Sequence, residues 1–259
     1  MIPRVLTVAT SDSGGAAGIQ ADLKAFARCG AHGMSALVAL TAQNTLAVTA
    51  IHELPPEFVR IQIDTVLDDI GADAVKTGML FSAPLIEVVA DTLAPRHLPL
   101  VVDPVMVASS GARLLRDDAV ATLTGKLFPL ATVITPNLNE AQALTGITTE
   151  DRKELAERLA AMGAHAVIVT GGHGTRAVDH LFDGQTHTEI EVPRYPVAAT
   201  HGAGCTHSAA LAAGLASGLA LEDAARQAAR VAGDAVAHGL PELGGGDGPV
   251  HALHQAGSA

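Results

Sequence analysis

Short apolar runs alternate with amphipathic helical patterns along the chain, and this alternation is typical of βαβ units. Seven of the runs predict strands, at residues 4–10, 35–40, 48–54, 74–77, 100–102, 132–135 and 166–170. Two more lie between Ala177 and Pro193, on either side of Asp183-Gly184, a dipeptide that favours a hairpin turn. The chain is therefore expected to build its sheet from many short strands.

Helical patterns fill the stretches between these runs. Residues 19–29 predict a helix that Gly30 stops, and residues 57–70 predict one that Gly71 ends. One stripe of the second helix holds Val59, Ile63, Val66, Leu67 and Ile70. Two closing helices are expected, from about Gly204 and over residues 222–238. We predict an α/β fold of three αβα layers, with helices on both faces of a mostly parallel sheet, and a single domain over residues 1–259.

The charge and cysteine content of the chain limit the classes of molecule that it can bind and the compartment in which it works. The formal net charge is −11 with histidine neutral, so the chain has no excess of lysine and arginine to bind a nucleic-acid backbone. Two cysteines, Cys29 and Cys205, are too few for a disulfide framework, which fits a reducing cytoplasm. The sequence shows no signal-peptide pattern and no unbroken apolar run of membrane-spanning length. We expect a cytoplasmic protein that binds a small-molecule substrate, and neither a nucleic acid nor a membrane.

Ligands of open parallel sheets bind at the carboxyl ends of the strands, so the loops there carry the candidate chemistry. The most informative loop is Gly202-Ala203-Gly204-Cys205, which opens an alanine-rich helix. Small residues let backbone N–H groups approach a phosphate, and a helix N-terminus favours an anion. We expect the same field to lower the pKa of Cys205, so that its thiolate accepts a proton from a substrate hydroxyl while the amides of Gly202, Ala203 and Gly204 hold the phosphoryl group. A glycine-rich helix start with a structural cysteine has the same spacing, and the residues alone leave both interpretations open.

A second loop, from Ser11 to Lys24, follows the first strand and opens the first helix. It matches neither GxGxxG nor a Walker A loop, because it holds no Gly-Lys-Ser/Thr. Polar and small residues at the end of a strand are typical of a binding site. The alternative is a helix cap with a flexible turn, which leaves Asp22 and Lys24 on a solvated face.

Two carboxylates, Asp103 and Glu140, follow two of the predicted strands. Mg²⁺ bound with a nucleotide takes one or two carboxylates together with waters and phosphate oxygens. Taken singly, each of the two carboxylates fits a helix cap better than a metal site, and Asn137 and Glu140 have the spacing of a cap and its reciprocal partner. The coincidence of both carboxylates at one edge favours a metal. The turn Thr170-Gly171-Gly172 fits either a contact to a nucleotide or a glycine-rich turn that precedes a hairpin.

These segments resemble the hydroxymethylpyrimidine/phosphomethylpyrimidine kinases of thiamine biosynthesis, in the ribokinase-like superfamily. The resemblance runs nearly end to end. Its motifs are Ser11-Asp12 with Ala17-Gly18-Ile19-Gln20-Ala21-Asp22-Leu23-Lys24, Thr41-Ala42-Gln43-Asn44-Thr45, Lys76-Thr77-Gly78-Met79-Leu80, Asp103-Pro104-Val105-Met106-Val107, Thr135-Pro136-Asn137 with Glu140, Gly171-Gly172-His173 and His201-Gly202-Ala203-Gly204-Cys205-Thr206.

The resemblance implies transfer of the γ-phosphate of ATP to 4-amino-5-hydroxymethyl-2-methylpyrimidine and then to its monophosphate, with Mg²⁺ as cofactor. It implies that Gln43, whose amide both donates and accepts, binds the pyrimidine. It places Ser11, Asp22 and Met79 around the same pocket, and Asn137, Thr170, Gly172 and Thr206 near ATP. It makes Cys205 the catalytic base, puts Asp103 and Glu140 near Mg²⁺, and implies a homodimer.

The chain departs from the family pattern at three positions. Thr10 stands where glycine is usual, and Ser109 and Thr170 stand where lysine is usual. A lysine at the last position commonly lies near the nucleotide phosphates, so its loss is expected to weaken charge stabilisation in the transition state. The second phosphorylation is expected to suffer more, and Arg113 or Arg176 is a candidate to compensate.

Two other functions stay open at this point. The vitamin B6 kinases, which act on pyridoxal or pyridoxine, share the cysteine-containing turn and act on a similar flat ring with a hydroxymethyl arm, and Gln43 is compatible with either ring. A catalytically weak protein that holds vitamin precursors would fit the missing lysines. The presence of Cys205, Asp103 and Glu140 argues against that last alternative.

Overall fold

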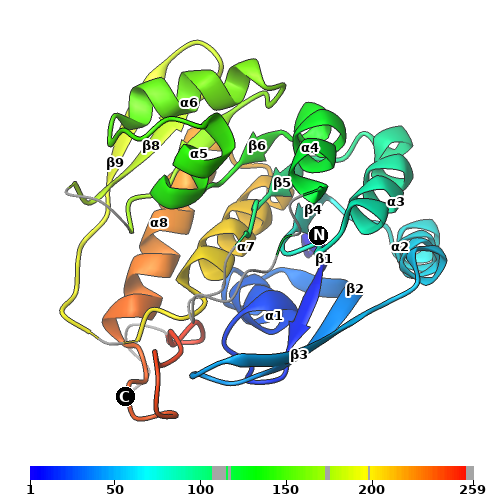
Figure 1. Cartoon of the computed structure of the whole chain (residues 1–259), viewed down its shortest axis with the longest axis horizontal. Helices are drawn as coiled ribbons and strands as arrows, with labels where there is room; N and C mark the ends of the chain where they lie inside the picture. The colour runs from blue at the N-terminus through cyan, green and yellow to red at the C-terminus, as the bar shows by residue number, and fades with distance from the viewer. Residues whose placement is uncertain (107–114, 116–117, 173–175, 198, 255–259) are drawn as a thin grey trace.

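The computed structural model describes residues 1–106, 115, 118–172, 176–197 and 199–254, and the strands of this part form one nine-stranded sheet (Figure 1). The strands are β1 (Arg4–Asp12), β2 (His32–Gln43), β3 (Val48–Glu53), β4 (Ala74–Thr77), β5 (Leu100–Val102), β6 (Val133–Ile134), β7 (Val167–Val169), β8 (Val178–Phe182) and β9 (His187–Glu191). Their order across the sheet is β3-β2-β1-β4-β5-β6-β7-β8-β9.

The middle of the sheet is parallel and its two edges are not. Each pair from β2 through β1, β4, β5 and β6 to β7 is parallel, whereas β3 pairs antiparallel with β2, and β8 and β9 extend the other side as an antiparallel hairpin. In the register, Lys76 of β4 lies between Thr7 of β1 and Val101 of β5. The carboxyl ends of six parallel strands therefore meet at one edge, where the loops analysed below lie.

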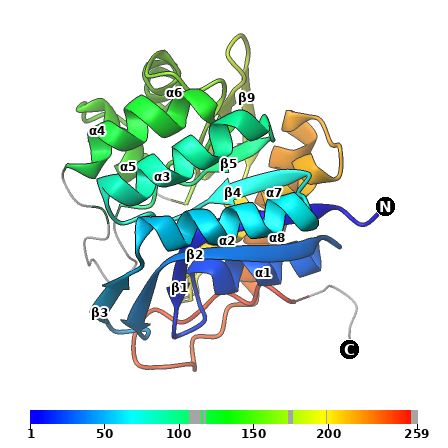
Figure 2. The same cartoon turned by 90° about the vertical axis from the view of Figure 1, so that its right-hand side faces the viewer.

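Helices cover both faces of the sheet. They are α1 (Gly18–Arg28), α2 (Pro56–Asp69), α3 (Ala83–Leu93), α4 (Ala119–Thr122), α5 (Leu138–Thr145), α6 (Arg152–Ala161), α7 (Ala203–Ala216) and α8 (Leu221–Ala237), with short turns η1 (Ala94–Arg96), η2 (Leu123–Leu127) and η3 (Phe128–Leu130). One apolar core lies between one face of the sheet and the helices α2, α3, α4, α5 and α6. A second apolar core lies between the other face and the helices α1, α7 and α8. Figure 2 shows α2 and α3 side by side on the first face.

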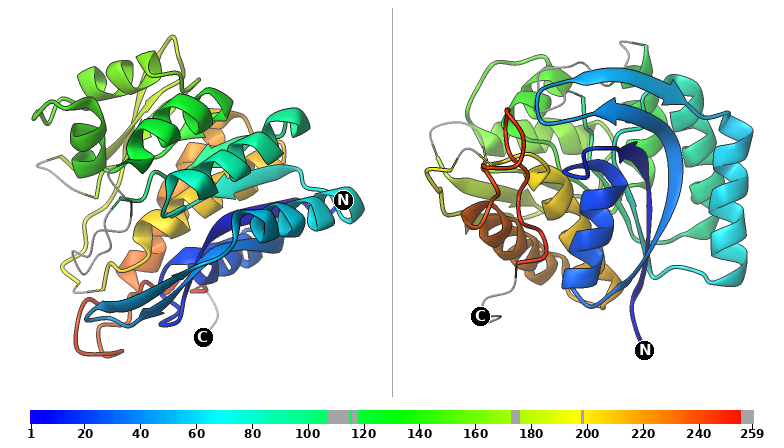
Figure 3. Two further views of the ribbon diagram at one scale, coloured as in Figure 1. Left: turned by 45° about the vertical axis from the view of Figure 1, so that its right-hand side comes forward. Right: turned by 90° about the horizontal axis from the view of Figure 1, so that it is seen from below.

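Small side chains let α7 pack closely on the second face. The five residues from Ala209 to Ala213 are fully buried between the sheet and α8. A Cβ on Gly214 would lie 3.0 Å from the Cβ of Ala224 in α8. The near absence of aromatic residues thus suits helices that lie close on the sheet and on one another, as α7 and α8 do (Figure 3).

The predicted architecture is confirmed: three layers, a mostly parallel sheet, and the hairpin around Asp183-Gly184. Two details differ. β2 is longer than predicted, from His32 to Gln43, because it pairs with β1 from His32 to Thr41 and its last residues, from Ala39 to Gln43, also pair with β3. The stripe predicted on α2 is wrong at Ile70, which lies at the C-cap and is exposed, while Val59, Ile63 and Leu67 are buried. Within the described residues, no helix is long and apolar enough to cross a membrane.

Candidate active site

The start of α7 is a turn with unpaired backbone amides. Gly202 precedes the helix in the left-handed region, with φ of 88°. The N–H of Ala203 donates to the carbonyl of Thr200 at 3.0 Å, so this amide is not free, contrary to the prediction. Within the described residues, the amides of Gly202, Gly204 and Cys205 have no backbone acceptor. If this turn binds an anion, as predicted, the amide of Cys205 rather than that of Ala203 is available as the third donor.

The same turn lies directly against the loop after β1. A Cβ on Gly202 would lie 1.8 Å from the carbonyl oxygen of Ala16, so no other residue fits this conformation and this contact. Gly18 repeats the constraint at the start of α1, since its Cβ would lie 2.3 Å from the carbonyl oxygen of Thr10. The two glycine-rich segments predicted separately from the sequence thus form one surface.

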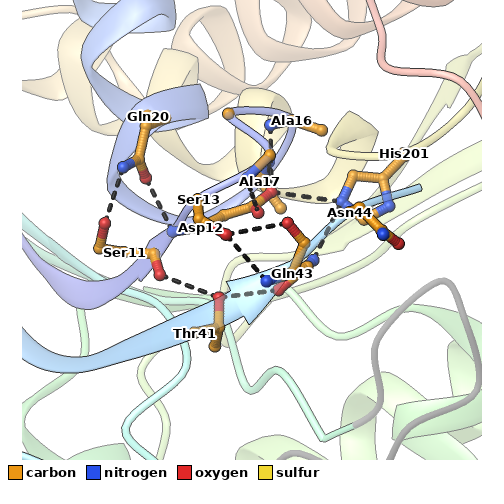
Figure 4. Close-up of polar contacts among 12 residues, drawn as sticks. Ser11, Asp12, Ser13, Ala16, Ala17, Gln20, Thr41, Gln43, Asn44 and His201 are labelled. Atoms are coloured by element: carbon orange, nitrogen blue, oxygen red, sulfur yellow. Dashed lines mark hydrogen bonds and ion pairs between the residues drawn. The ribbon is translucent and has the colours of Figure 1, made fainter. Parts of the chain in front are cut away.

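Asp12 organises the loop after β1 (Figure 4). Its Oδ1 accepts from the N–H of Gly14 at 2.8 Å, and its Oδ2 accepts from Ala16 at 3.0 Å and Ala17 at 2.8 Å. Burial alone would raise the pKa of Asp12, but His201 and the backbone N–H groups lower it below the ordinary value. A buried carboxylate therefore fixes the loop that supports the anion turn.

His201 lies between the carboxylate of Asp12 and Gln43, the residue predicted to bind the pyrimidine. Its Nε2 lies 3.5 Å from Oδ2 of Asp12 and 3.3 Å from Nε2 of Gln43. The Oε1 of Gln43 accepts from Oγ1 of Thr41 at 3.1 Å. Figure 4 shows the Gln43 and His201 side chains meeting from β2 and from the segment before α7. The half-buried amide of Gln43 is thus oriented by its neighbours, as a group that recognises a ring edge must be.

The C-terminal segment covers this corner. The N–H of His201 donates to the carbonyl of Gly248 at 3.2 Å, and Val250 donates back to His201 at 3.0 Å. Further along, the N–H of Gly246 donates to Oγ1 of Thr45 at 3.2 Å, at the β2–β3 turn. In Figure 1 this segment, coloured orange-red to red, lies beside the tip of β3. Residues 240–250 therefore hold the anion turn and the β2–β3 turn together.

Asp22 lies beneath the surface of the site. Its carboxylate is fully buried and accepts from Nζ of Lys76 at 2.8 and 2.9 Å and from Oγ1 of Thr7 at 2.6 Å. The alternative that placed Asp22 on a solvated face is wrong. Lys24, which the same alternative placed on that face, is exposed, and its ammonium donates to the carbonyl of Gly15 at 2.7 Å. Because both oxygens of Asp22 are occupied, a direct substrate contact by this carboxylate stays a prediction.

The other predicted pocket residues lie at the ends of β1 and β4. Oγ1 of Thr10 donates to the carbonyl of Met79 at 3.1 Å, so the residue that departs from the family pattern fixes the backbone of one predicted to line the pocket. Met79 itself is buried. Oγ of Ser11 accepts from the side-chain amide of Gln20 at 2.7 Å.

The thiol of Cys205 differs from the prediction. Part of the residue reaches solvent, yet burial of the thiol raises its pKa to about 12, with Lys76 opposing the rise and Asp103 and Asp22 adding to it. The predicted low pKa is therefore wrong for this structure. Lys76 and the N–H of Gly18, at the start of α1, lower the pKa, but burial and two carboxylates outweigh them.

The two predicted metal ligands are buried acids at the carboxyl edge. Oδ2 of Asp103 accepts from Oγ of Ser208 at 2.9 Å. Glu140 completes a capping box with Asn137, since its Oε2 accepts from the Asn137 N–H at 2.9 Å and its own N–H donates to Oδ1 of Asn137 at 3.0 Å. The capping role of Glu140 is therefore confirmed, while metal binding by Glu140 stays a prediction. Burial and the charge of Asp103 raise the pKa of Glu140 to about 8. Two buried carboxylates that repel each other offer hard oxygen ligands, and this donor set fits Mg²⁺.

The predicted ATP residues fall into two groups. Asn137 and Thr170 lie opposite each other in a parallel bridge, and the N–H of Thr170 donates to the carbonyl of Pro136 at 2.9 Å. Gly172 is exposed beside them. Thr206, in contrast, is fully buried and its hydroxyl has no hydrogen-bond partner among the described residues. An ATP contact by Thr206 is therefore the least supported of the four predictions.

A buried pair ties the Thr170–Gly172 turn to α7. Oδ1 of Asp179 accepts from the N–H of Gly171 at 2.6 Å, and its Oδ2 lies 2.9 Å from Nε2 of His207. Since His207 lies in the first turns of α7, this pair fixes the position of the turn relative to Cys205.

Sequence reasoning gave no role to Asp12, His201 or Lys76. An aspartate two residues before a glycine pair is a known turn signal, so the role of Asp12 in this turn could have been predicted from the sequence. A lysine inside an apolar strand implies a buried partner, but the identity of that partner is not visible in the sequence. Ser109 and Arg113 lie outside the described residues.

Gly202→Ala is expected to lower the free energy of unfolding by about 2–5 kcal/mol, because Ala strains the left-handed backbone and meets the Ala16 carbonyl. Gly204→Ala is the matched control in the same turn, since nothing lies within 4 Å of its Cβ, and its change should stay within about 1 kcal/mol. Urea denaturation followed by circular dichroism measures both. Equal losses would contradict the close contact.

Glu140→Gln is expected to flatten the pH dependence of stability while keeping the capping geometry. The carboxyl has an ordinary pKa of 4.5 and a value of about 8 in the fold. A raised pKa favours the protonated form on folding, so this stability is present at low pH and is lost as pH rises toward 8. Between pH 5.5 and 8.5 the parent protein should lose at least about 1 kcal/mol more than the variant in urea denaturation. Parallel pH profiles would rule out the raised pKa.

Comparisons with known proteins agree with this geometry. The phosphomethylpyrimidine kinase family matches residues 12–251. A hydroxymethylpyrimidine/phosphomethylpyrimidine kinase of Streptomyces coelicolor is 49% identical over 252 residues, covering 96% of this chain and 93% of that protein. Among solved structures, a pyridoxal kinase of Bacillus subtilis in complex with ADP has a TM-score of 0.88 at 39% identity, covering 96% of this chain and 97% of that one. A phosphomethylpyrimidine kinase of Clostridium difficile has a TM-score of 0.79 at 38% identity, covering 88% and 96%. The fold is thus ribokinase-like, and the chain belongs to the phosphomethylpyrimidine kinase family.

Proposed function

We propose that the protein uses ATP to phosphorylate 4-amino-5-hydroxymethyl-2-methylpyrimidine, and then its monophosphate, in thiamine biosynthesis. The observation that carries the proposal is the pairing of two recognition elements. His201 places the side-chain amide of Gln43 next to the turn whose amides at Gly202, Gly204 and Cys205 are free for an anion. A ring edge and a phosphoryl group would meet at this corner, in a chain about half identical to curated kinases with this activity.

At the ring end, Gln43 offers both a donor and an acceptor to an aminopyrimidine edge. Thr41 and His201 hold the amide from two sides, so little side-chain entropy is lost on binding. Met79 and Ser11 are proposed to complete the pocket, and Asp22 to support it from below.

At the phosphate end, the free amides of the turn would stabilise charge on the migrating phosphoryl group. Asn137, Thr170 and Gly172 are proposed to line the nucleotide, and Asp103 and Glu140 to hold Mg²⁺. The cation supplies charge neutralisation on the nucleotide phosphates. Cys205 would take the proton of the hydroxymethyl group while that oxygen bonds to the γ-phosphorus and the bond to the ADP oxygen breaks.

Arg176 was a candidate to replace the charge of the lysine that is missing at Thr170, but its guanidinium is already paired with Glu189. Both guanidinium N–H groups of Arg176 that face Glu189 donate to its carboxylate at 2.7 Å, on an exposed surface. Compensation by Arg176 would first have to break this bidentate pair. The second phosphorylation, onto an anionic substrate, is therefore proposed to be the slower of the two.

A pyridoxal kinase activity is the second candidate, because a pyridoxal kinase structure covers 96% of this chain with a TM-score of 0.88. Gln43 suits either heteroaromatic ring. This pyridoxal kinase is 39% identical to the chain, whereas the Streptomyces coelicolor pyrimidine kinase is 49% identical, and this difference favours the pyrimidine.

Three further predictions from the sequence accompany the function: one domain over residues 1–259, a homodimer, and a cytoplasmic location. Sedimentation equilibrium measures the second, and a monomer at micromolar concentration would contradict it.

The substrate is tested by incubating the purified protein with Mg-ATP and each of three acceptors: the hydroxymethylpyrimidine, its monophosphate and pyridoxal. Mass spectrometry of the products should show the monophosphate and the diphosphate of the pyrimidine, with the first formed faster. Phosphorylation of pyridoxal alone would move the protein to vitamin B6 salvage. No product from any acceptor would favour a protein that only binds vitamin precursors.

Cys205→Ala is expected to lower kcat by about 100-fold or more while the Kd for ATP changes less than about threefold, because a base acts in the transition state. Since the free thiol has a pKa of about 12, kcat/KM of the parent should rise with pH and reach no plateau below pH 9.5. Steady-state kinetics and ATP titration calorimetry measure both. Equal losses in turnover and in ATP binding would instead make Cys205 structural.

A further inference from the structure

The ring of His201 lies where two hydrogen-bonding groups compete for one nitrogen. The side chain is buried, and its Nε2 lies 3.5 Å from Oδ2 of Asp12 and 3.3 Å from the side-chain nitrogen of Gln43. An ionised carboxylate only accepts hydrogen bonds, whereas the NH2 group of an amide only donates them. A single ring nitrogen cannot donate to the first and accept from the second. The proton on His201 therefore suits one neighbour, and the other has to adapt.

Asp12 is the neighbour that cannot adapt. Its buried carboxylate accepts from the N–H groups of Gly14 at 2.8 Å, Ala16 at 3.0 Å and Ala17 at 2.8 Å. Three backbone donors hold a carboxylate in its charged form and in one orientation. This charge repels a nitrogen lone pair of His201 and attracts an N–H group. Asp12 thus favours the state of His201 that carries a proton on Nε2.

The amide of Gln43 is the neighbour that can adapt. A half turn about its last side-chain bond exchanges Oε1 with Nε2 and directs the oxygen toward the Nε2–H of His201. The hydroxyl of Thr41 gains from the same turn. It has one proton, but it lies 3.0 Å from the carbonyl of Ser11 and 3.1 Å from Oε1 of Gln43, so with the oxygen on this side it can satisfy only one of them. After the turn it donates to Ser11 and accepts from the amide NH2, and every group is satisfied.

The orientation of this amide decides which group of a bound ring it recognises. His201 directly precedes Gly202, so the end of the Gln43 amide that faces His201 is the end nearer the anion turn (Figure 4). In the pyrimidine, the 4-amino group lies between the 5-hydroxymethyl arm and the ring nitrogen N3. An amide oxygen near the turn would accept from this amino group, while the amide N–H would donate to N3. Pyridoxal instead has a carbonyl group beside its hydroxymethyl arm, and this carbonyl would meet the oxygen as a second acceptor.

We propose that His201 is a positioning residue that determines substrate specificity. Asp12 holds the proton of His201 on Nε2, and this proton turns the oxygen of Gln43 toward the anion turn, where it selects a ring with an amino group beside the reacting arm. The identity of that ring rests on the proposed function. The position of the proton and the orientation of the amide do not depend on turnover.

Nitrogen NMR measures the position of the proton directly. In protein labelled with ¹⁵N at histidine, long-range ¹H–¹⁵N correlations distinguish a protonated ring nitrogen from an unprotonated one, and the His201 signals are those that disappear in His201→Gln. At pH 8, Nε2 of His201 is expected to carry a proton. A proton on Nδ1 alone would overturn the proposal.

Ring binding in the absence of ATP tests the specificity with a matched pair of variants. His201→Gln keeps a side-chain N–H that Asp12 can orient, whereas His201→Met has a similar length and no donor. Titration calorimetry compares the pyrimidine with an analogue that lacks the 4-amino group. The ratio of the two Kd values is expected to be about tenfold or more in the parent and in His201→Gln, and about threefold or less in His201→Met, where the amide is free to turn.

Equal ratios in the two variants would leave His201 with a structural role and overturn the proposal. Circular dichroism and the Kd for ATP, which should change less than about threefold, show whether the fold and the nucleotide site of each variant are intact. If a variant does not fold, the ¹⁵N spectrum of the parent, with its signals assigned by the other variant, still decides the position of the proton. Failure of phosphoryl transfer together with the expected proton and ratios would overturn only the proposed function.

Discussion

The buried ammonium of Lys76 is the interaction on which the carboxyl edge of the sheet depends. It bonds Asp22 directly and lies close enough to Asp103 and Cys205 for their charges to interact. In a low-dielectric interior, acidic groups this close cannot all ionise without a cation. Burial is the largest cause that raises the pKa values of Asp103, Glu140 and Cys205, and the charge of Lys76 opposes the rise at Asp103 and Cys205. Carboxylates held this close favour the presence of an added cation.

A second constraint is steric. The carbonyl of Ala16 occupies the space that any Cβ at position 202 would need, so the anion turn and the loop after β1 have one relative position. Asp12 fixes the loop, His201 joins it to Gln43, and the chain near Gly248 pairs with His201. Segments from both ends of the chain and from the β2–β3 turn thus meet at one corner. This geometry fixes the position of Gln43 relative to the turn that begins at Gly202, which are the two groups proposed to bind the ring and the phosphate.

Much of this was readable in the sequence, because periodicity and turn residues are local signals. The strands at residues 74–77 and 100–102 have the predicted bounds, and Asp103 and Glu140 lie at the predicted edge. What failed depended on distant contacts. Asp22 and Lys76 are 54 residues apart, so the sequence gave no sign that their side chains meet. The helix start predicted a lowered pKa for Cys205, but burial and two carboxylates from other elements raise it. The amide of Ala203 was assigned to the anion without knowledge that Thr200 accepts from it.

The account stands on the charge state of one thiol, which can be observed directly. In the Cys29→Ser protein labelled with ¹³C at the cysteine β-carbon, a single Cys205 signal moves when the thiol ionises, so its chemical shift can be followed from pH 6 to 10. The structure predicts no ionisation in this range for the free protein, in line with a pKa of about 12. A titration midpoint below pH 8 would contradict the charge balance described for the carboxyl edge, in which burial, Asp103 and Asp22 outweigh Lys76.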